Sequence, residues 1–295
     1  MSAIAVCETP TRPVLRYHGG KWRLAPWVIS HFPPHRVYVE PFGGAASVLM
    51  RKPRSYAEVY NDLDGEVVNV FRVLRDPVLS SELETLLCLT PFSRVEFESA
   101  YEVATEQLSE VERARRTIVK AFMGFGSNAI HAGKPRGMRT RASTWGHDTG
   151  FRANSHRSGT TPAHDWSRYP VHIHVFRDRL AGVVLEHRKA IECILQHDRA
   201  DTLHYADPPY VMSTRSDPQK DYLHELTDDD HRDLAELLHS VTGMVVLSGY
   251  RSSLYDELYG TWERYDIKAF ADGARERTEC LWLSPRAMDA KGRLF

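Results

Sequence analysis

The chain has 295 residues, of which 42% are hydrophobic and 26% are charged, as in an ordinary globular protein. Its apolar runs, such as Met244–Leu247, are far shorter than the ~20 residues that span a bilayer, so we expect no membrane partner. Residues 1–13 lack the charged and apolar segments of a signal peptide. The four cysteines are widely spaced and fit neither a zinc site nor a disulfide framework, which favours a cytoplasmic location.

The net charge of −1 is distributed unevenly along the chain. Between Gly126 and Arg179, nine basic residues and six of the fifteen histidines stand against three acidic residues. Such a segment is either a solvated loop or a surface that meets a polyanion such as a phosphate backbone. The basic residues are Lys134, Arg136, Arg139, Arg141, Arg152, Arg157, Arg168, Arg177 and Arg179.

The first third of the chain alternates between predicted strands and helices. The β-rich run Arg36–Glu40 stops at Pro41-Phe42-Gly43-Gly44, where two glycines indicate a turn. A helix is predicted to begin over Ala45–Met50, followed by a strand over Glu58–Tyr60. The apolar residues of Gly65–Leu74 then have helical spacing.

The middle of the chain has a different character. Phe92–Gly124 is predicted to be helical, with its apolar residues on one side. Gly126–Tyr169 is rich in Gly, Ser, Thr, Arg and His and poor in aliphatic residues. A loop of this length inside a compact domain is usually functional or disordered.

Strand–helix alternation resumes after this segment. The predicted strands cover Val183–Glu186, Thr202–Ala206 and Gly243–Ser248, with a terminal β pair over Trp262–Ile267 and Thr278–Leu283. One helix is predicted over Ala190–Gln196, and Thr227–Asp230 resembles a capping box that opens a second. We therefore predict an α/β domain formed by residues 1–74 and 183–295, with an insertion over 75–182 and a largely parallel sheet covered on both faces.

A glycine turn follows the first predicted strand, within Val39–Gly44. Glycines there let a ligand approach the backbone closely, although an ordinary tight turn uses them as well. Asp62 ends the next strand, 22 residues after Glu40, near the spacing at which an acid binds ribose hydroxyls. For Asp62 alone, a helix N-cap is the alternative. Together the two features favour a cofactor that contains adenosine.

The tetrapeptide Asp207-Pro208-Pro209-Tyr210 ends the strand over 202–206. Because proline is about 5% of average usage, a chance match to this pattern has a probability on the order of one in a hundred. The pattern suits methylation of a planar amine. A carboxylate and a backbone carbonyl would each accept an N–H, which frees the nitrogen lone pair for in-line attack on a methylsulfonium. The tyrosine offers a stacking face to a base that has been flipped out of its duplex.

At this point the sequence resembles a known family, the Dam-type (α-group, D12 class) DNA-adenine N6-methyltransferases. The resemblance implies a Rossmann-like fold with a mixed, mostly parallel seven-stranded sheet. It also implies an inserted target-recognition domain of helices and loops over 75–182, and a phage or prophage origin is a further expectation. The motifs that carry it are Tyr17-His18-Gly19-Gly20-Lys21, Val39–Gly44, Asn61-Asp62, Asp207–Tyr210, Ser248-Gly249-Tyr250 and Leu281–Ser284.

The family also implies roles for individual residues. Asp207, Pro208, Pro209 and Tyr210 would form the catalytic motif, with Pro208 supplying the carbonyl and Tyr210 stacking on the flipped adenine. S-adenosylmethionine (SAM) would be the methyl donor, with no metal required. Its expected contacts are Tyr17, Lys21, Glu40, Phe42, Gly43, Gly44, Asp62 and Asp207, with Lys21 near the polar end of SAM and Asp62 at the ribose.

One residue departs from the family pattern. The family often places an acid at the end of the strand before the catalytic one, close to the SAM adenine, and Lys189 stands there in this chain.

Double-stranded DNA is the expected partner, with no obligate protein partner. The residues expected to contact it are Lys134, Arg136, Arg139, Arg141, Arg152 and Arg215.

Other readings of the same motifs stay open at this stage. Cytosine N4, RNA adenine and protein glutamine are alternative acceptors with the same amine chemistry. The aspartate at position 207, the order of the motifs and the basic insertion favour DNA adenine. A different class of protein, a DNA-binding relative without catalysis, would keep the basic segment but would not bind SAM.

Replacing Arg139 and Arg141 with alanine is expected to weaken DNA binding and to leave SAM affinity unchanged. If each contacts one phosphate, the slope of log K against log salt concentration should fall in magnitude by about 2. Fluorescence anisotropy with duplex DNA over a salt series measures this slope, and an unchanged slope would place the DNA-binding surface elsewhere.

Overall fold

The structure is a computed structural model that describes residues 8–102, 107–127, 129–131, 149–153, 160–215, 222–270 and 276–292. The chain forms two compact units. The sheet unit comprises Lys21–Asp64 and Gly182–Phe295, and the helical unit comprises Met1–Gly20 and Gly65–Ala181. The boundaries predicted from the sequence differ from these units in the placement of residues 1–20 and 65–74.

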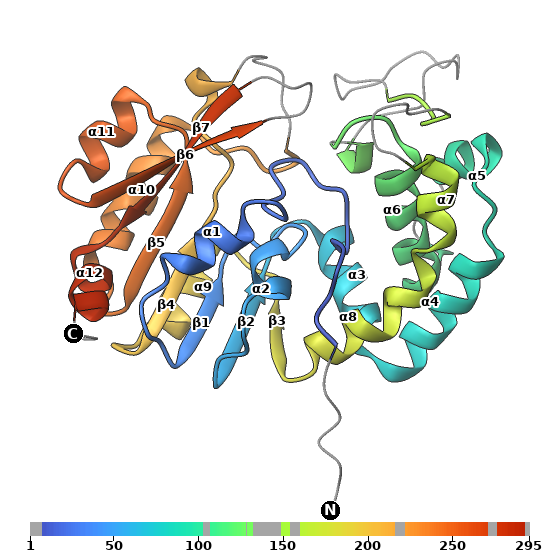
Figure 1. Cartoon of the computed structure of the whole chain (residues 1–295), viewed down its shortest axis with the longest axis horizontal. Coiled ribbons are helices and arrows are strands. Elements are labelled where there is room, and N and C mark those ends of the chain that lie inside the picture. The colour runs from blue at the N-terminus through green and yellow to red at the C-terminus, as the bar shows by residue number, and fades with distance from the viewer. Residues whose placement is uncertain are drawn as a thin grey trace, which may run out of the picture. The chain divides into compact units, whose positions relative to one another are not determined.

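A mixed sheet of seven strands, mostly parallel, organises the sheet unit in the order β3-β2-β1-β4-β5-β7-β6 (Figure 1). The first five strands in that order pair in parallel, and β7 pairs antiparallel with both β5 and β6. This confirms the predicted fold class. The strands are β1 (Val37–Glu40), β2 (Ala57–Asn61), β3 (Val183–Glu186), β4 (Thr202–Ala206), β5 (Met244–Gly249), β6 (Glu263–Phe270) and β7 (Glu276–Leu283).

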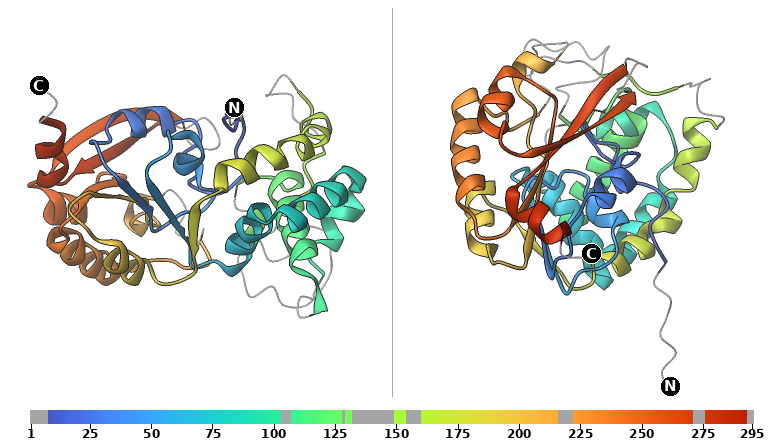
Figure 2. Two further views of the ribbon diagram at one scale, coloured as in Figure 1. Left: turned by 90° about the horizontal axis from the view of Figure 1, so that it is seen from below. Right: turned by 60° about the vertical axis from the view of Figure 1, so that its left-hand side comes forward.

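Helices lie on both faces of this sheet, as Figure 2 shows. Because β4 and β5 are central strands, every one of their residues is buried, including the polar side chains of Thr202, His204 and Ser248. Helices α9, α10 and α11 cover one face and α1 and α2 cover the other. The helices of the unit are α1 (Ala25–Ser30), α2 (Ser47–Arg51), α9 (Ala190–His197), α10 (Asp228–Ser240), α11 (Ser253–Tyr259) and α12 (Pro285–Gly292), with a short 3₁₀ helix η4 (Met212–Thr214).

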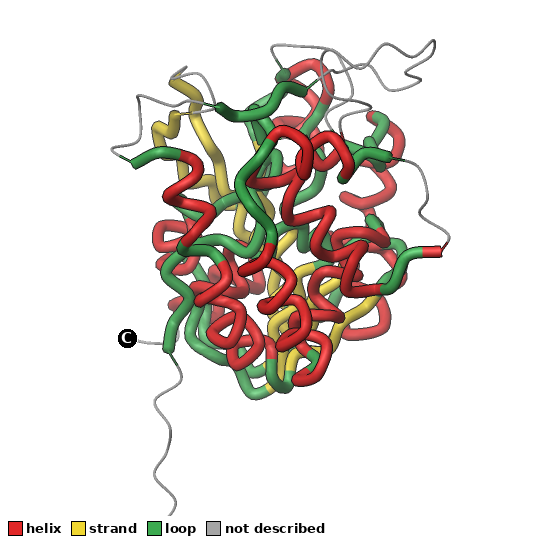
Figure 3. Tube along the Cα trace, turned by 90° about the vertical axis from the view of Figure 1, so that its right-hand side faces the viewer, coloured by secondary structure: helices red, strands yellow, loops and turns green. Residues whose placement is uncertain are grey.

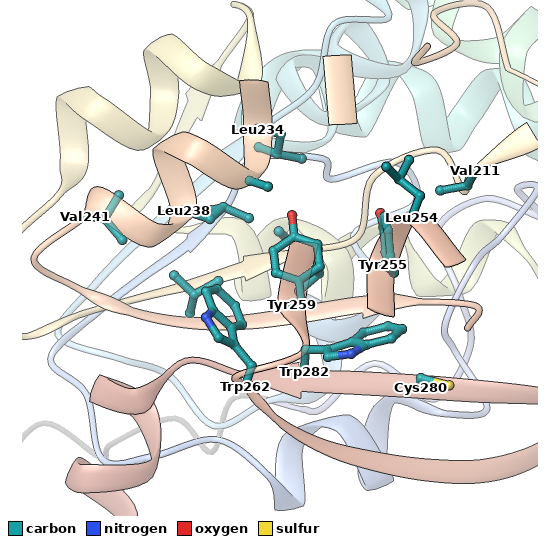
Figure 4. Close-up of a cluster of buried hydrophobic side chains, with 14 of the residues drawn as sticks. Val211, Leu234, Leu238, Val241, Leu254, Tyr255, Tyr259, Trp262, Cys280 and Trp282 are labelled. Atoms are coloured by element: carbon teal, nitrogen blue, oxygen red, sulfur yellow. The ribbon is translucent and has the colours of Figure 1, made fainter. Parts of the chain in front are cut away.

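The largest hydrophobic cluster lies between α10, α11 and the strands β4, β5 and β7. Figure 4 shows Tyr255, Tyr259, Trp262 and Trp282 at its centre, facing Leu234 and Leu238 of α10. The three aromatic side chains Tyr255, Tyr259 and Trp282 meet at ring centroid distances of 5.2 to 6.4 Å. Val211, the residue after the tetrapeptide Asp207–Tyr210, belongs to the same cluster, so the end of that segment is anchored in the core.

The predicted capping box opens α10. The Thr227 backbone N–H donates to Asp230 Oδ2 at 2.8 Å, and the Asp230 N–H donates to Thr227 Oγ1 at 3.1 Å. These two bonds satisfy amide groups that the first helical turn leaves without partners. No helix in the described ranges is long and apolar enough to cross a membrane.

The helical unit consists of helices and connecting loops, drawn in red and green in Figure 3. Asp76, Ser93, Ser109 and Thr161 each accept backbone N–H groups as N-caps of the helices that follow them. The helices are α3 (Gly65–Arg75), α4 (Pro77–Leu89), α5 (Arg94–Ser99), α6 (Glu110–Met123), α7 (Pro162–Ser167) and α8 (Ile173–Leu180), with 3₁₀ helices η2 (Ala129–His131) and η3 (Pro170–His172).

The N-terminal segment packs into the helical unit rather than the sheet unit. Arg12 lies over the rings of Phe122 and Tyr169, and its guanidinium pairs with Asp165 at 3.3 Å. The Tyr169 hydroxyl donates to the Val14 carbonyl at 2.7 Å. These buried contacts explain why residues 8–20 group with helices that follow them much later in the sequence.

The prediction of helical structure throughout 92–124 was wrong in detail. Two separate helices, α5 and α6, occupy this region, and each begins at its own serine cap. The apolar spacing continues across both helices and therefore does not reveal the interruption. No helix was predicted at the positions of α1, α4, α7, α8, α11 and α12, and α7 lies inside the segment Gly126–Tyr169 that was predicted to be a loop. Most of these are short, and the amphipathic pattern in a short helix covers too few turns to stand out.

Candidate functional site

The two strand-end motifs lie at the point where the strand order reverses. Strand β1 pairs with β2 on one side and with β4 on the other, so the chain turns in opposite directions from this pair. In open parallel sheets, ligands bind beyond the carboxyl ends of the strands at such a point. The segment after β1, Pro41–Ala46, and the segment after β4, Asp207–Tyr210, both begin there.

The glycine turn after β1 is held tightly against β2. The Gly43 N–H donates to the Asn61 carbonyl at 2.8 Å, and the Tyr60 hydroxyl donates to the Gly44 carbonyl at 2.7 Å. A Cβ atom at Gly43 would overlap the ring of Tyr60. Gly44 and Ala46 have φ angles of 47° and 52°, a left-handed conformation that is uncommon for alanine. The glycine at 43 is therefore required by packing, and that at 44 by backbone conformation.

Asp62 connects the end of β2 to this turn. Its Oδ2 accepts the Gly44 N–H at 2.7 Å, and its Oδ1 accepts the Asp64 N–H at 2.8 Å. The second bond closes a short turn of the kind that aspartate forms ahead of a helix, in line with the N-cap alternative. Beside it, the Asn61 side chain bonds the carbonyl of Pro41 and both backbone groups of Arg188, so it ties the ends of β1, β2 and β3 together.

Glu40, the last residue of β1, is buried. Its Oε2 accepts the Tyr38 hydroxyl at 2.8 Å and the Leu49 N–H at 3.0 Å. Burial raises the pKa of this carboxyl to about 8, against the opposing effect of those two hydrogen bonds. The charge of Asp207 acts in the same direction as burial. The raised pKa favours the protonated form of Glu40.

The tetrapeptide Asp207–Tyr210 carries the central charge cluster of the site. Lys21 Nζ lies 3.0 Å from Asp207 Oδ1, 3.5 Å from Glu279 Oε1 and 4.8 Å from the centre of the Tyr210 ring. The Tyr210 hydroxyl donates to Glu279 Oε1. Burial alone would lower the pKa of Lys21, but the two carboxylates outweigh it and raise that pKa above its ordinary value. Burial raises the pKa of Asp207, which Lys21 opposes.

The structure brings Glu279, which was not predicted as a site residue, to this cluster, where it lies in β7 with only 5% of its side chain exposed. Two residues of the motif Ser248-Gly249-Tyr250 lie close by. Tyr250 meets the Tyr210 ring edge-on at 4.7 Å, and Ser248 shares a hydrogen bond with Tyr205 of β4 at 2.8 Å. The signal available for Glu279 was an acid inside the predicted strand Thr278–Leu283, directly before its apolar run, because a buried acid requires a partner.

Arg215 lies beside the tetrapeptide Asp207–Tyr210. Its guanidinium donates twice to the Tyr210 carbonyl, at 2.7 and 3.0 Å, and forms a two-point ion pair with Glu225 at 2.8 Å. Only 6% of its side chain is exposed. In this arrangement Arg215 supports Tyr210, whereas a DNA contact would need its guanidinium at the surface.

The other residues predicted for the site lie away from the charge cluster around Lys21 or outside the described residues. Phe42 packs against the large hydrophobic cluster. Tyr17 belongs to the helical unit, where its ring meets His131 edge-on at 5.6 Å. Arg152, half-buried, donates its backbone N–H to the Met123 carbonyl at 2.7 Å. Lys134, Arg136, Arg139 and Arg141 lie outside the described residues.

Lys189, which departs from the family pattern, is exposed at the N-cap of α9. Glu186, three residues earlier, ends β3 and accepts hydrogen bonds from Arg188 at 2.9 Å and His197 at 3.2 Å. The part of the chain that the structure describes holds no group of three or more His, Cys, Asp and Glu side chains arranged to hold a metal ion.

The chain resembles one known family over part of its length. Residues 17–125 match the model of the D12 class N6 adenine-specific DNA methyltransferase family. This confirms the resemblance to that family, whose members are enzymes that methylate adenine in DNA. The match includes Lys21, the glycine turn and Asp62, and it ends before the tetrapeptide Asp207–Tyr210. A comparison with curated proteins found no match.

Gly43→Ala is expected to destabilise the sheet unit, because its Cβ would overlap the Tyr60 ring between two backbone segments that cannot easily separate. Overpacking of this kind typically costs about 1–3 kcal/mol of unfolding free energy. Urea unfolding followed by circular dichroism measures the change. Gly150→Ala is the matched control, since nothing lies within 4 Å of a Cβ there. Equal stability of the two variants would contradict the packing requirement.

Glu40→Gln is expected to change how stability depends on pH. With its pKa raised to about 8 when folded, Glu40 contributes stability that is complete below its unfolded pKa and is lost as the pH rises to about 8. The loss approaches about 1.4 kcal/mol per pH unit for one proton. Glutamine retains an acceptor for Tyr38 and Leu49 and does not ionise.

The variant should therefore become progressively more stable than the wild type between pH 5 and 8, by this linkage. Urea unfolding at several pH values, with Glu82→Gln on the exposed side of α4 as control, measures the difference. A difference that does not vary with pH would show that Glu40 is already ionised in the folded protein.

Proposed function

We propose that this protein transfers a methyl group from SAM to the exocyclic N6 of adenine in double-stranded DNA, with the base flipped into the site and direct in-line transfer. The observation that carries the proposal is the buried cluster of Asp207, Tyr210 and Lys21 at the reversal of strand order. The family match supports adenine in DNA as the acceptor.

The chemistry of the site fits a SAM molecule. Ser47 Oγ, directly after the glycine turn, is buried and has no hydrogen-bond partner among the described residues, which suits a polar ligand at that position. Asp62 supplies a carboxylate for ribose hydroxyls, and Lys21 supplies a cation for the methionine carboxylate. The residues proposed to hold SAM are Tyr17, Lys21, Glu40, Phe42, Gly43, Gly44, Asp62 and Asp207, with Tyr17 proposed from the family resemblance alone.

SAM, when bound, supplies a methyl group already activated as a sulfonium. The protein's own task is then to make the adenine amine nucleophilic. Asp207 accepts one N–H of the amine, and the Pro208 carbonyl accepts the other, so that the nitrogen lone pair is no longer delocalised into the ring. Pro208 and Pro209 restrict the backbone and hold that carbonyl in place. The methylated amine gives up one proton, for which the Asp207 carboxylate is the adjacent acceptor.

Tyr210 and its neighbours position the base. Stacking on the Tyr210 ring would offset the cost of a few kcal/mol for removing the base from its duplex. The two bonds from Arg215 to the Tyr210 carbonyl restrain the backbone directly after the two prolines. Contacts with DNA phosphates are proposed for Lys134, Arg136, Arg139, Arg141 and Arg152. Arg215 is proposed to contact DNA only if its pair with Glu225 opens.

Asp207→Ala should reduce the rate of methyl transfer at least about 100-fold, as removal of a group that stabilises the reacting amine does. DNA binding should largely survive, because phosphate contacts supply most of it. Mass spectrometry of nucleosides from treated DNA measures transfer, and anisotropy measures binding. Asp201→Ala, exposed just before the same strand, is the matched control.

Two outcomes would count against the proposal. More than about a tenth of the wild-type rate in Asp207→Ala would contradict the role of that carboxylate, given the size of effect expected for such a group. Formation of N4-methylcytosine without N6-methyladenine would assign a different base. Calorimetry with SAM separates the enzyme from a DNA-binding relative without catalysis, which should show no heat of binding.

A further inference from the structure

Glu279 occupies an unusual place for an acid. It lies in β7, a strand between β5 and β6, and its neighbour in the strand, Cys280, pairs with Gly249 at the end of β5. This register brings the Glu279 side chain to the carboxyl end of the parallel strands, where β4 delivers Asp207. A carboxylate buried to this degree is costly unless it is paired and hydrogen-bonded.

The partners of Glu279 are the Tyr210 hydroxyl and the Lys21 ammonium. Its Oε1 accepts the Tyr210 hydroxyl and lies 3.5 Å from Lys21 Nζ. Lys21 lies 3.0 Å from Asp207 and 4.8 Å from the Tyr210 ring centre. One carboxylate oxygen thus contacts both Tyr210 and the cation that pairs with Asp207.

We propose that Glu279 is a positioning residue for methyl transfer, which holds the Tyr210 ring and the Lys21 ammonium in place around Asp207. The inference rests on the proposed function and extends it to a residue of β7. When Asp207 turns from Lys21 to the substrate amine, Glu279 stays 3.5 Å from the Lys21 ammonium as its second carboxylate. Glu279 keeps that cation paired throughout, so Asp207 can accept the amine N–H without exposing an uncompensated charge.

Glu279 also affects the charge of Asp207. Two buried carboxylates share one ammonium, so each makes ionisation of the other more difficult. Burial raises the pKa of Glu279, and the charge of Asp207 raises it further against the effect of Lys21. Without the charge at position 279, Asp207 no longer shares the Lys21 ammonium with a second carboxylate. The pKa of Asp207 should then fall, and activity that needs ionised Asp207 should persist to lower pH.

The test compares Glu279→Leu, which cannot accept a hydrogen bond, with Glu279→Gln, which can. Rates of methyl transfer to duplex DNA are measured from pH 5 to 9 for both variants and the wild type, with SAM affinity and thermal unfolding as checks. We expect kcat to fall about 10- to 100-fold in Glu279→Leu, the loss that follows when the hydrogen bonds of a charged buried group are removed. Glu279→Gln should restore most of it.

The acidic limb of kcat/KM in Glu279→Gln should also move to lower pH. A merely structural role would change the rate at every pH and would not move the limb. Glu263→Leu and Glu263→Gln, at an exposed position of the adjacent strand β6, are the matched controls and should leave both readouts unchanged.

The possible outcomes separate this inference from the proposed function. A wild type that transfers no methyl group to DNA would overturn both. If the wild type is active, two results would overturn the role of Glu279 and leave the proposed function standing. One is an equal loss of kcat in the Leu and Gln variants. The other is no loss of kcat in either variant together with an acidic limb that does not move. If Glu279→Leu does not fold, the position of the acidic limb in Glu279→Gln decides alone.

Discussion

The parallel pairing of β1 with β4 is the constraint on which the candidate site depends. These strands are distant in sequence, yet Val37, Tyr38 and Val39 lie opposite Thr202, Leu203 and His204. Because both strands run in the same direction, their carboxyl ends meet at one edge of the sheet. The glycine turn that follows β1 and the tetrapeptide that follows β4 thereby become neighbours. The two halves of the proposed reaction, holding a cofactor and activating an amine, meet only through this pairing.

A second feature of the site is that its charges are buried and shared. Lys21 pairs with both Asp207 and Glu279. Glu40 ends the adjacent strand β1, and burial together with the charge of Asp207 raises its pKa to about 8. Ionising Glu40 next to Asp207 would add the cost of desolvation and of like-charge repulsion. The raised pKa of Glu40 favours its neutral form and so limits the negative charge buried beside Asp207.

The family match and the catalytic tetrapeptide support the same assignment from different parts of the chain. Residues 17–125 contain Lys21, the glycine turn and Asp62, which are the features expected at a cofactor. Asp207–Tyr210 lies well beyond the matched residues and carries the amine chemistry. The structure joins these parts through the contact between Lys21 and Asp207, a direct link between the matched region and the tetrapeptide.

Much of this architecture followed from local features of the sequence. The β-rich runs that stop at Pro41 and Asp207, the capping box at Thr227 and the glycine turn all depend on residues within a few positions of one another. Steric limits on the backbone and short hydrogen bonds act at that range, so the sequence by itself determined the strands, their ends and the two motifs. Tertiary structure alone decided that Glu279 contacts Tyr210 and that Arg215 forms an ion pair with Glu225 beside the tetrapeptide. It also decided that residues 8–20 pack with the helical unit. Each of these depends on burial and pairing between segments far apart in the chain, and no local pattern of residue types encodes which distant segment will supply the partner.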